Sequence, residues 1–260
     1  MKKRVLSAFM ALALCLTLLP TAALAEETAE TKVAEVTISG GTPTQYADID
    51  AAFAAAQQAG SATVKLLTDV TLSKEYDYGI ELTSGEITLD LNGRTIQTTG
   101  RASGFVLLNA VFYIEDGSSL TVQDSGNDGK IVQPNAGQAI GVSSGNLTVK
   151  SGTIEVMSTV TKKDGPTTQN CAVLVRGSGT ANIQGGILTG NKGIYVKSGT
   201  LTVGGGTIHG RGSYALQVAG GSVRLSGGSY TTDVTDGCSI WNADGTAAAL
   251  LVNGYRFESE

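Results

Sequence analysis

Three residues, Tyr195, Gln217 and Trp241, take the same position in successive short apolar segments of the sequence. Arg176 and Lys197 each follow an equivalent position by two residues. If these segments are strands of one sheet, alternate side chains point to one face, so all five residues share that face. Aromatic rings with polar neighbours on a flat sheet can stack on sugar rings. The spacing therefore predicts a glycan-binding surface, and the alternative is a scaffold whose surface residues have no ligand.

Residues 124–129 (Asp-Ser-Gly-Asn-Asp-Gly) have the composition of a calcium-binding loop. Their third position is Gly126, however, and no glutamate stands where such a loop places its bidentate ligand. Asp, Asn and Gly are also the residues of tight turns. The segment is therefore predicted to be a turn, and no metal or other cofactor is expected.

The sequence offers no clear catalytic set. Glycosidases of the usual kind need two carboxylates roughly 5 to 10 Å apart, and neighbouring repeats do not place two acids in the same outward column. His209, the only histidine, is expected to be an exposed residue beside a turn. No catalytic residue is predicted, and an enzyme is the weaker of the function classes.

A repeated phrase defines the elements that must position these residues. It consists of glycine followed by alternating polar and apolar residues, and four copies occupy residues 145–149, 179–183, 199–203 and 221–225. The last three copies begin 20 and 22 residues apart. A second and a third short strand follow each copy, which is one turn of a three-sided coil.

The predicted fold class is all-β: a single-stranded right-handed parallel β-helix with three sheets and about 20–22 residues per turn. The 35 glycines and four prolines suit many tight turns. The apolar residues predicted to face inward are Val122, Val149, Ile183, Val203 and Leu225. The polar residues predicted to face outward beside them are Thr88, Thr121, Thr148, Asn182, Thr202 and Arg224.

A short helix is expected near residues 48–58, because Asp48 stands at its start and Gly60 just past its end. It would cap the apolar end of the coil, and the alternative is a surface helix packed elsewhere. The predicted division is a signal peptide at 1–25, an N-terminal strand, helix cap and first coil at 26–84, and β-helix turns at 85–260. The last part is expected to be the front of a longer protein, since no wall-sorting motif follows it.

The first 25 residues have the three parts of a bacterial secretory signal peptide: Lys2, Lys3 and Arg4, an apolar run, and a small-residue site ending at Ala25. Cleavage there leaves 15 of the 18 basic residues against 23 acidic ones, a formal charge of −8. An acidic surface does not favour nucleic acid or anionic lipid as a partner. We therefore expect a secreted, extracellular or cell-surface protein without a membrane span.

Two further stretches resemble a known superfamily. Residues 46–55, with Gly60 and the apolar run 64–67, resemble the N-terminal cap and first strand of pectate-lyase-like β-helix proteins. Residues 89–96 resemble the aspartate-asparagine-glycine turn of the same superfamily. The resemblance covers nearly all of the mature chain and implies the parallel β-helix fold. It extends to the β-helix regions of bacterial cell-surface proteins, many of which have no known activity.

The leading hypothesis is a non-catalytic adhesive or structural module that binds a polysaccharide or host glycan and associates with the cell wall through a missing C-terminal region. The alternative implied by the resemblance is a polyuronide lyase or glycoside hydrolase. His209 and Gly210 resemble part of the glycine-histidine-glycine element of polygalacturonases, but the aspartate pairs and arginine-x-lysine element of those enzymes are not found.

The two exported cysteines are predicted not to form an intramolecular disulfide. Cys171 and Cys238 each precede a third strand, and two such strands lie between theirs. Three turns correspond to roughly 14 Å at about 4.8 Å per turn. A disulfide allows no more than about 7 Å between α-carbons.

Overall fold

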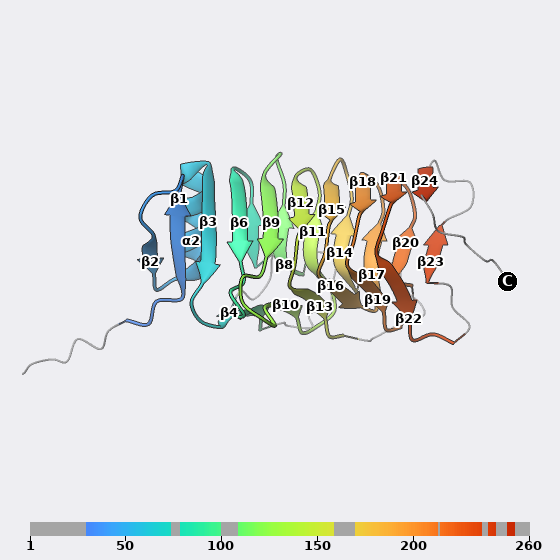
Figure 1. The fold of residues 1–260 in the computed structure, drawn as a ribbon, viewed down its shortest axis with the longest axis horizontal. Helices are drawn as coiled ribbons and strands as arrows, with labels where there is room; N and C mark the ends of the chain where they lie inside the picture. The colour runs from blue at the N-terminus through green and yellow to red at the C-terminus, as the bar shows by residue number, and fades with distance from the viewer. Residues whose placement is uncertain are drawn as a thin grey trace, which may run out of the picture. The chain divides into compact units, whose positions relative to one another are not determined.

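Three sheets run along the chain, and each turn of the coil adds one strand to each of them (Figure 1). The computed structural model describes residues 30–73, 79–99, 109–158, 170–212, 214–235 and 239–242, and the backbone of 249–252. We refer to the sheets as A, B and C in the order in which the chain visits them. Neighbouring strands of each sheet come from successive turns, which is the arrangement of a parallel β-helix.

Sheet A contains the repeated phrase. Its strands, in spatial order, are β2 (Thr44–Tyr46), β1 (Ala34–Ile38), β3 (Ser61–Leu66), β6 (Glu86–Asp90), β9 (Ser119–Gln123), β12 (Asn146–Val149), β15 (Thr180–Ile183), β18 (Thr200–Val203), β21 (Ser222–Leu225) and β24 (Ala249–Val252). From β3 onward all pairs are parallel. β1 pairs antiparallel with both β2 and β3, an arrangement the sequence did not predict.

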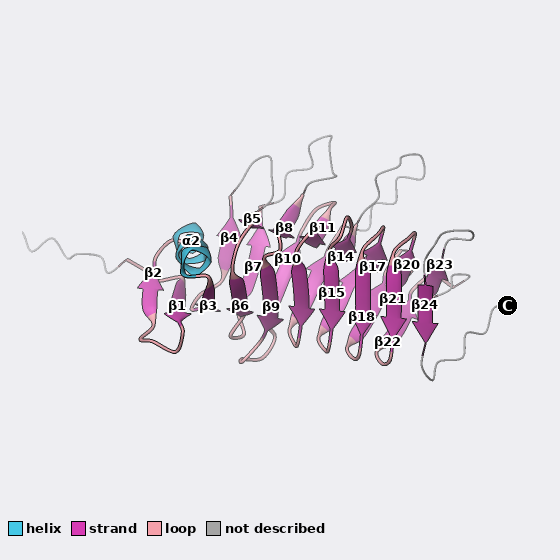
Figure 2. Cartoon of the chain, turned by 90° about the horizontal axis from the view of Figure 1, so that it is seen from above, coloured by secondary structure: helices cyan, strands magenta, loops and turns pink. Residues whose placement is uncertain are grey.

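Sheets B and C are parallel throughout. Sheet B contains β4 (Val70–Leu72), β7 (Thr95–Thr98), β10 (Lys130–Gln133), β13 (Thr153–Val156), β16 (Ile187–Gly190), β19 (Thr207–Gly210) and β22 (Ser229–Thr232). Sheet C contains β5 (Ile80–Leu82), β8 (Ala110–Ile114), β11 (Gln138–Val142), β14 (Cys171–Val175), β17 (Lys192–Val196), β20 (Leu216–Val218) and β23 (Ile240–Asn242). The strand labels follow the same order in the view from above (Figure 2).

The predicted inward column of sheet A is confirmed. Val122, Val149, Ile183, Val203 and Leu225 are in register, and none is more than 1% exposed. The polar residues between them, Thr88 to Arg224, form the outward column and are partly or fully exposed. Period-two alternation of apolar and polar residues is therefore sufficient to assign the two sides of this sheet.

Turn length varies because the connection from sheet B to sheet C varies. Thr180, Thr200 and Ser222 are equivalent residues 20 and 22 residues apart, as predicted, whereas Asn146 and Thr180 are 34 apart. Asn191 alone joins β16 to β17, but 14 residues separate β13 from β14. Insertions are thus accommodated at one corner while the strands stay in register.

The connection from sheet A to sheet B is short and depends on glycine. Gly206 has φ +89°, and an added Cβ would lie 2.9 Å from the carbonyl oxygens of Gly185 and Gly186 in the turn below. Any side chain at this position would be strained and would collide with the neighbouring turn. The same positive φ occurs at the glycines that directly precede β13, β16 and β22, namely Gly152, Gly186 and Gly228.

Helix α2 (Ile49–Ala59) covers the apolar end of the first turns, as predicted. Asp48 caps its start by accepting a hydrogen bond from the Asp50 backbone N–H, and Gly60 ends it with φ 77°. Phe53 packs against Phe112 of β8 with ring centroids 5.5 Å apart. The Gln57 side chain donates a hydrogen bond to the carbonyl of Glu81 in β5 and accepts one from the backbone N–H of Thr83, just after β5. Because β5 is the terminal strand of sheet C, the helix also covers an exposed sheet edge.

Several predictions fall outside the described residues. The signal peptide at 1–25 and Cys238 are among them, and the direction in which the coil winds stays a prediction from the crossover rule. The predicted number of strands between the segments that follow the two cysteines is confirmed, because Val173, Ile194, Leu216 and Ile240 are successive partners in sheet C.

In the described part of the chain, no helix is both long and apolar enough to cross a membrane.

Candidate functional site on the outer face of sheet C

The five residues predicted to bind glycan are brought together on the outer face of sheet C. Tyr195, Gln217 and Trp241 are direct partners on β17, β20 and β23. Arg176 and Lys197 lie in the next outward column, two residues further along the chain. The backbone N–H of each bonds the last residue of the neighbouring strand, Arg176 to Val142 and Lys197 to Val175. The predicted placement is therefore confirmed, and glycan binding by these residues stays a prediction.

The middle column of this face continues toward the N-terminus through residues that the sequence did not single out. Its members in order are Glu81, Tyr113, Gly141, Leu174, Tyr195, Gln217 and Trp241. Tyr113 and Leu174 are fully buried although they point away from the core of the coil. The face is thus partly covered over these two strands.

The Tyr113 ring lies flat against the sheet because the next strand has no side chain there. A Cβ added to Gly141 would be 2.6 Å from Cδ2 of Tyr113. The guanidinium carbon of Arg176 lies 5.1 Å from the ring centroid, which is a cation–π contact. Arg176 is therefore positioned by packing against an aromatic ring.

Tyr195 and Trp241 lie on the outer side of sheet C, as predicted, and both are half-buried there. Lys192 Nζ lies 5.4 Å from the centroid of the Tyr195 ring. Burial, and then the nearby Cys171, raise the pKa of Tyr195. Trp241 stacks on Tyr214, with centroids 5.7 Å apart and planes 19° apart. Two aromatic platforms therefore border this face, and Tyr214 is a member that the sequence analysis missed.

A third column at the corner between sheets B and C consists of Gln138, Cys171 and Lys192. Strict alternation would point these side chains inward together with Ile140 and Val173. The pairing is instead interrupted at Ala139 and Ala172, which join the core cluster, while the register stays the same on both sides. Gln138 and Cys171, the first residues of these strands, are not part of that core cluster.

Buried polar atoms without a hydrogen-bond partner collect on this face. Both amide atoms of Gln138, Nε of Arg176, Nδ2 of Asn191 and Oε1 of Gln217 are in this state. Gln138 is 0% exposed and Asn191 is 2% exposed. Each such atom costs about 1–3 kcal/mol of stability. The one sign of Gln138 in the sequence is that a polar residue stands first in the otherwise apolar strand β11.

Burial dominates the chemistry of the other two corner residues. It lowers the pKa of Lys192, while the neighbouring Cys171 acts in the opposite direction. It raises the pKa of Cys171 to about 12, so the thiol stays protonated near neutral pH. A protonated thiol is a weak nucleophile, and Cys171 therefore behaves as a structural residue.

The N-terminal end of the same face is acidic. The pKa of Glu115 is raised by burial, and then by the negative charges of Glu81 and Asp116. Glu81 also contacts the Glu115 carboxyl group directly, and Ser143 donates a hydrogen bond to it. Neighbouring turns thus bring two acids close together, although not in the same outward column. The pairing is diagonal, since Glu115 follows β8 and lies beside Thr83 rather than Glu81.

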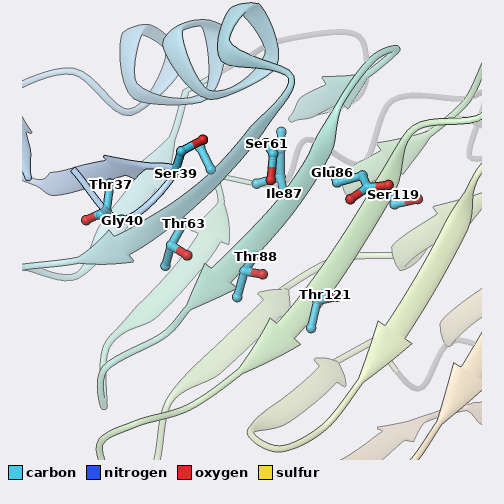
Figure 3. A pocket seen from close by; sticks show the side chains of 11 residues that line it. Thr37, Ser39, Gly40, Ser61, Thr63, Glu86, Ile87, Thr88, Ser119 and Thr121 are labelled. Atoms are coloured by element: carbon cyan, nitrogen blue, oxygen red, sulfur yellow. The ribbon is translucent and has the colours of Figure 1, made fainter.

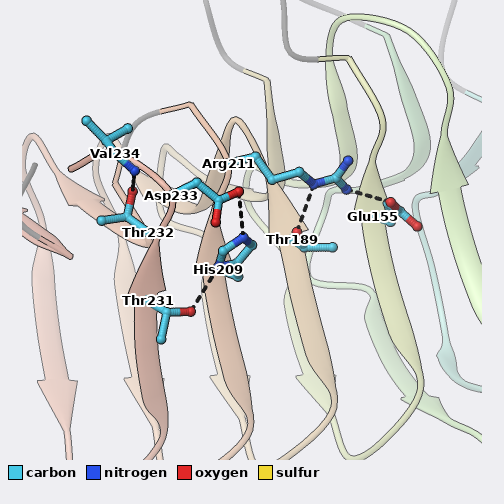
Figure 4. A network of polar contacts seen from close by, with 8 residues as sticks. All are labelled: Glu155, Thr189, His209, Arg211, Thr231, Thr232, Asp233 and Val234. Carbon is cyan, nitrogen blue, oxygen red and sulfur yellow. Dashed lines mark hydrogen bonds and ion pairs between the residues drawn. The ribbon is translucent and has the colours of Figure 1, made fainter.

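The outer face of sheet B carries a separate polar network (Figure 4). His209 contacts the Thr231 hydroxyl through Nδ1 at 2.9 Å and Asp233 through Nε2 at 3.3 Å. Its side chain is 26% exposed, so the prediction of an exposed residue was only partly right. Arg211 reaches across Thr189 to pair with Glu155, two strands away.

The outer face of sheet A is a ladder of hydroxyls with a shallow groove of about 470 Å³ at its N-terminal end (Figure 3). Thr37, Thr63, Thr88 and Thr121 occupy one column across β1, β3, β6 and β9. Glu86 is the one charged residue among those that line the groove. Such a surface can form hydrogen bonds, and Glu86 supplies the single carboxylate among its lining residues.

The segment with calcium-loop composition is a turn, as predicted. The Asp124 carboxylate accepts backbone N–H bonds from Gly93, Gly126 and Gly129 at 2.7, 3.2 and 2.9 Å. Asp90 likewise accepts from the backbone of Asn92 and Ser125. These carboxylates fix two adjacent turns to one another.

No family model, curated protein or solved structure matches this chain. The choice among the three outer faces therefore depends on their geometry. Among the described residues, only sheet C combines aromatic rings, cations packed on those rings and buried polar atoms without hydrogen-bond partners.

Proposed function

We propose that this chain is a secreted or cell-surface β-helix module that binds a polysaccharide or host glycan on the outer face of sheet C. We place it with the pectate-lyase-like β-helix proteins, beside their non-catalytic cell-surface members. The signal-like sequence at 1–25 supports export, with cleavage after Ala25. Association with the cell wall through a further C-terminal region belongs to the same proposal.

One observation carries the binding proposal: buried polar atoms without partners lie beside aromatic rings on one face. Both amide atoms of Gln138 and Oε1 of Gln217 are in this state, and an amide group can both donate and accept. Sugar hydroxyls also donate and accept, and sugar rings present apolar faces to aromatic side chains. A bound glycan would thus satisfy groups that the folded chain leaves unpaired.

A glycan array with the purified full chain tests this function. We expect binding to a defined set of glycans, and a large loss when Tyr195 and Trp241 are both replaced by alanine. Tyr46→Ala is the matched control, because Tyr46 is a half-buried tyrosine on β2, at the edge of sheet A. Retained binding by the double variant would place the site elsewhere.

The second candidate is a carbohydrate-active enzyme, a polyuronide lyase or a glycoside hydrolase. The specific observation in its favour is the close pair Glu81 and Glu115 on the same face, with the pKa of Glu115 raised by burial and by its acidic neighbours. A raised carboxyl pKa moves the group in the direction that a general acid requires. New reducing ends in the bound glycan, lost in Glu115→Gln, would establish catalysis; no release would favour binding alone.

A further inference from the structure

The groove at the N-terminal end of sheet A is lined by two rows of side chains that run across the strands (Figure 3). One row consists of Thr37, Thr63, Thr88 and Thr121. The other contains Ser61, Glu86 and Ser119, which are direct partners on β3, β6 and β9. The four threonines span three strand spacings, roughly 14 Å at about 4.8 Å each. The groove is therefore elongated, and it reaches solvent where Ser61 and Glu86 are exposed.

Glu86 supplies the one charge of this lining, and its carboxylate takes part in no ion pair or hydrogen bond with the residues that the structure describes. Ser61 and Ser119 stand one strand spacing away on either side of it. Ser119 Oγ accepts a hydrogen bond from Asn146 Nδ2 at 3.4 Å, and a hydroxyl oxygen can accept a second. The row thus presents an unpaired carboxylate between two hydroxyl oxygens.

A primary ammonium group matches this row, because it has three N–H donors and no acceptor. The carboxylate and the two hydroxyls can each accept one of the three. A calcium ion fits less well, since it takes about six to eight oxygen ligands and the lining holds a single carboxylate. The threonine row adds methyl groups, against which an aliphatic stem can pack while its charged end stays near solvent.

We propose that the groove binds a primary alkylammonium group, with Glu86, Ser61 and Ser119 holding the nitrogen and the threonine row contacting the aliphatic stem. The inference does not depend on glycan binding, because the groove lies on sheet A and the proposed glycan face on sheet C. The net charge of −5 favours the approach of a cation from solution. Free aliphatic amines and lysine side chains share this chemistry, so each enters the test as a separate probe.

The test is a ligand-observed NMR titration of the full chain with probes that share one stem. We expect pentylamine to bind, and its N-trimethyl analogue, which keeps the charge but has no N–H donor, to bind about fivefold or more weakly. Pentanol has the stem without the charge and should bind more weakly than pentylamine. A short acetylated peptide amide with one lysine shows whether the group is accepted from a peptide.

Two glutamate variants locate the binding. Glu86→Gln should weaken pentylamine binding about fivefold, because a hydrogen bond to a charged group is lost. Its melting temperature should change little, since Glu86 is exposed. Glu35→Gln is the matched control: it removes the same charge from the outer side of β1, outside the groove lining, and should leave the affinity unchanged.

The outcomes either support the site or remove it. Equal affinity for pentylamine and its trimethyl analogue, or equal losses in the two glutamate variants, would mean that the acidic chain attracts cations without a specific site, and overturns the proposal. Absence of binding by both pentylamine and the lysine peptide also overturns it. Binding of the peptide alone, lost in Glu86→Gln, supports the ammonium site and identifies lysine as the source of the group.

Discussion

The outer faces of sheets A and C are built by the same turns of one coil, yet they differ in every feature that bears on binding. Sheet A repeats small hydroxyl residues from strand to strand and holds one shallow polar groove. Sheet C replaces the repeat with tyrosines, a tryptophan, amides and cations, and several of their polar atoms are buried without partners. Because a regular repeat is sufficient for folding, departures from the repeat that reduce stability indicate a functional role for the residues concerned.

The core beneath sheet A supplies the largest expected effect. Val203→Asp places a carboxylate in a column that is 0% exposed, so we expect a loss of more than about 4 kcal/mol in unfolding free energy. Thr202→Asp, one residue away on the outer side, should change it by less than about 1 kcal/mol. Denaturant titration of the two variants measures the contrast. Similar losses would mean that the inner and outer sides of sheet A have been assigned wrongly.

A pair of glycines sharpens the comparison between the two faces. Gly141→Ala on sheet C would push a methyl group into the Tyr113 ring, 2.6 Å away, and should cost about 1–3 kcal/mol through overpacking. Gly204→Ala, beside sheet A, would place its methyl group no closer than 3.9 Å to any neighbour and should be nearly neutral. Thermal unfolding compares them, and an equal shift would show that the flat packing of Tyr113 is not required.

Gln138→Leu asks whether the buried amide serves the fold or a ligand. Replacing a polar group without partners by an apolar group of similar size should raise stability by about 1–2 kcal/mol in the absence of ligand. The same change should weaken glycan binding, because it removes a donor and an acceptor. A destabilised variant would instead mean that Gln138 has a structural partner, for example an ordered water molecule, and would remove it from the site.

The sequence predicts those parts of the molecule that follow a strict period. The columns of sheet A, the strand order and the placement of Tyr195, Gln217 and Trp241 all follow from alternation within the repeat. Gln138 could not be assigned, because the alternation breaks where the strand pairing is interrupted at Ala139, and a single sequence carries no sign of that interruption. The contact between Glu81 and Glu115 was missed because turns of unequal length hide which residues become neighbours.

The acidic end of sheet C should give the smallest effect, one that depends on pH. The pKa of Glu115 is raised above the ordinary carboxyl value of 4.5, chiefly by burial and then by Glu81 and Asp116. An acid with a higher pKa in the folded state binds more protons there. Its contribution to stability is therefore complete below the pKa of the unfolded chain and is lost as pH rises through the pKa of the folded chain.

Glu115→Gln cannot lose a proton and avoids this loss of stability. We therefore expect melting temperatures equal to the parent chain below about pH 4 and slightly higher than the parent at pH 7. Glu86→Gln on the outer face of sheet A removes the same formal charge away from this acidic group and serves as the control. An advantage of Glu115→Gln that is the same at every pH would show that the pKa of Glu115 is not raised in the folded chain, and would remove the observation that favours catalysis.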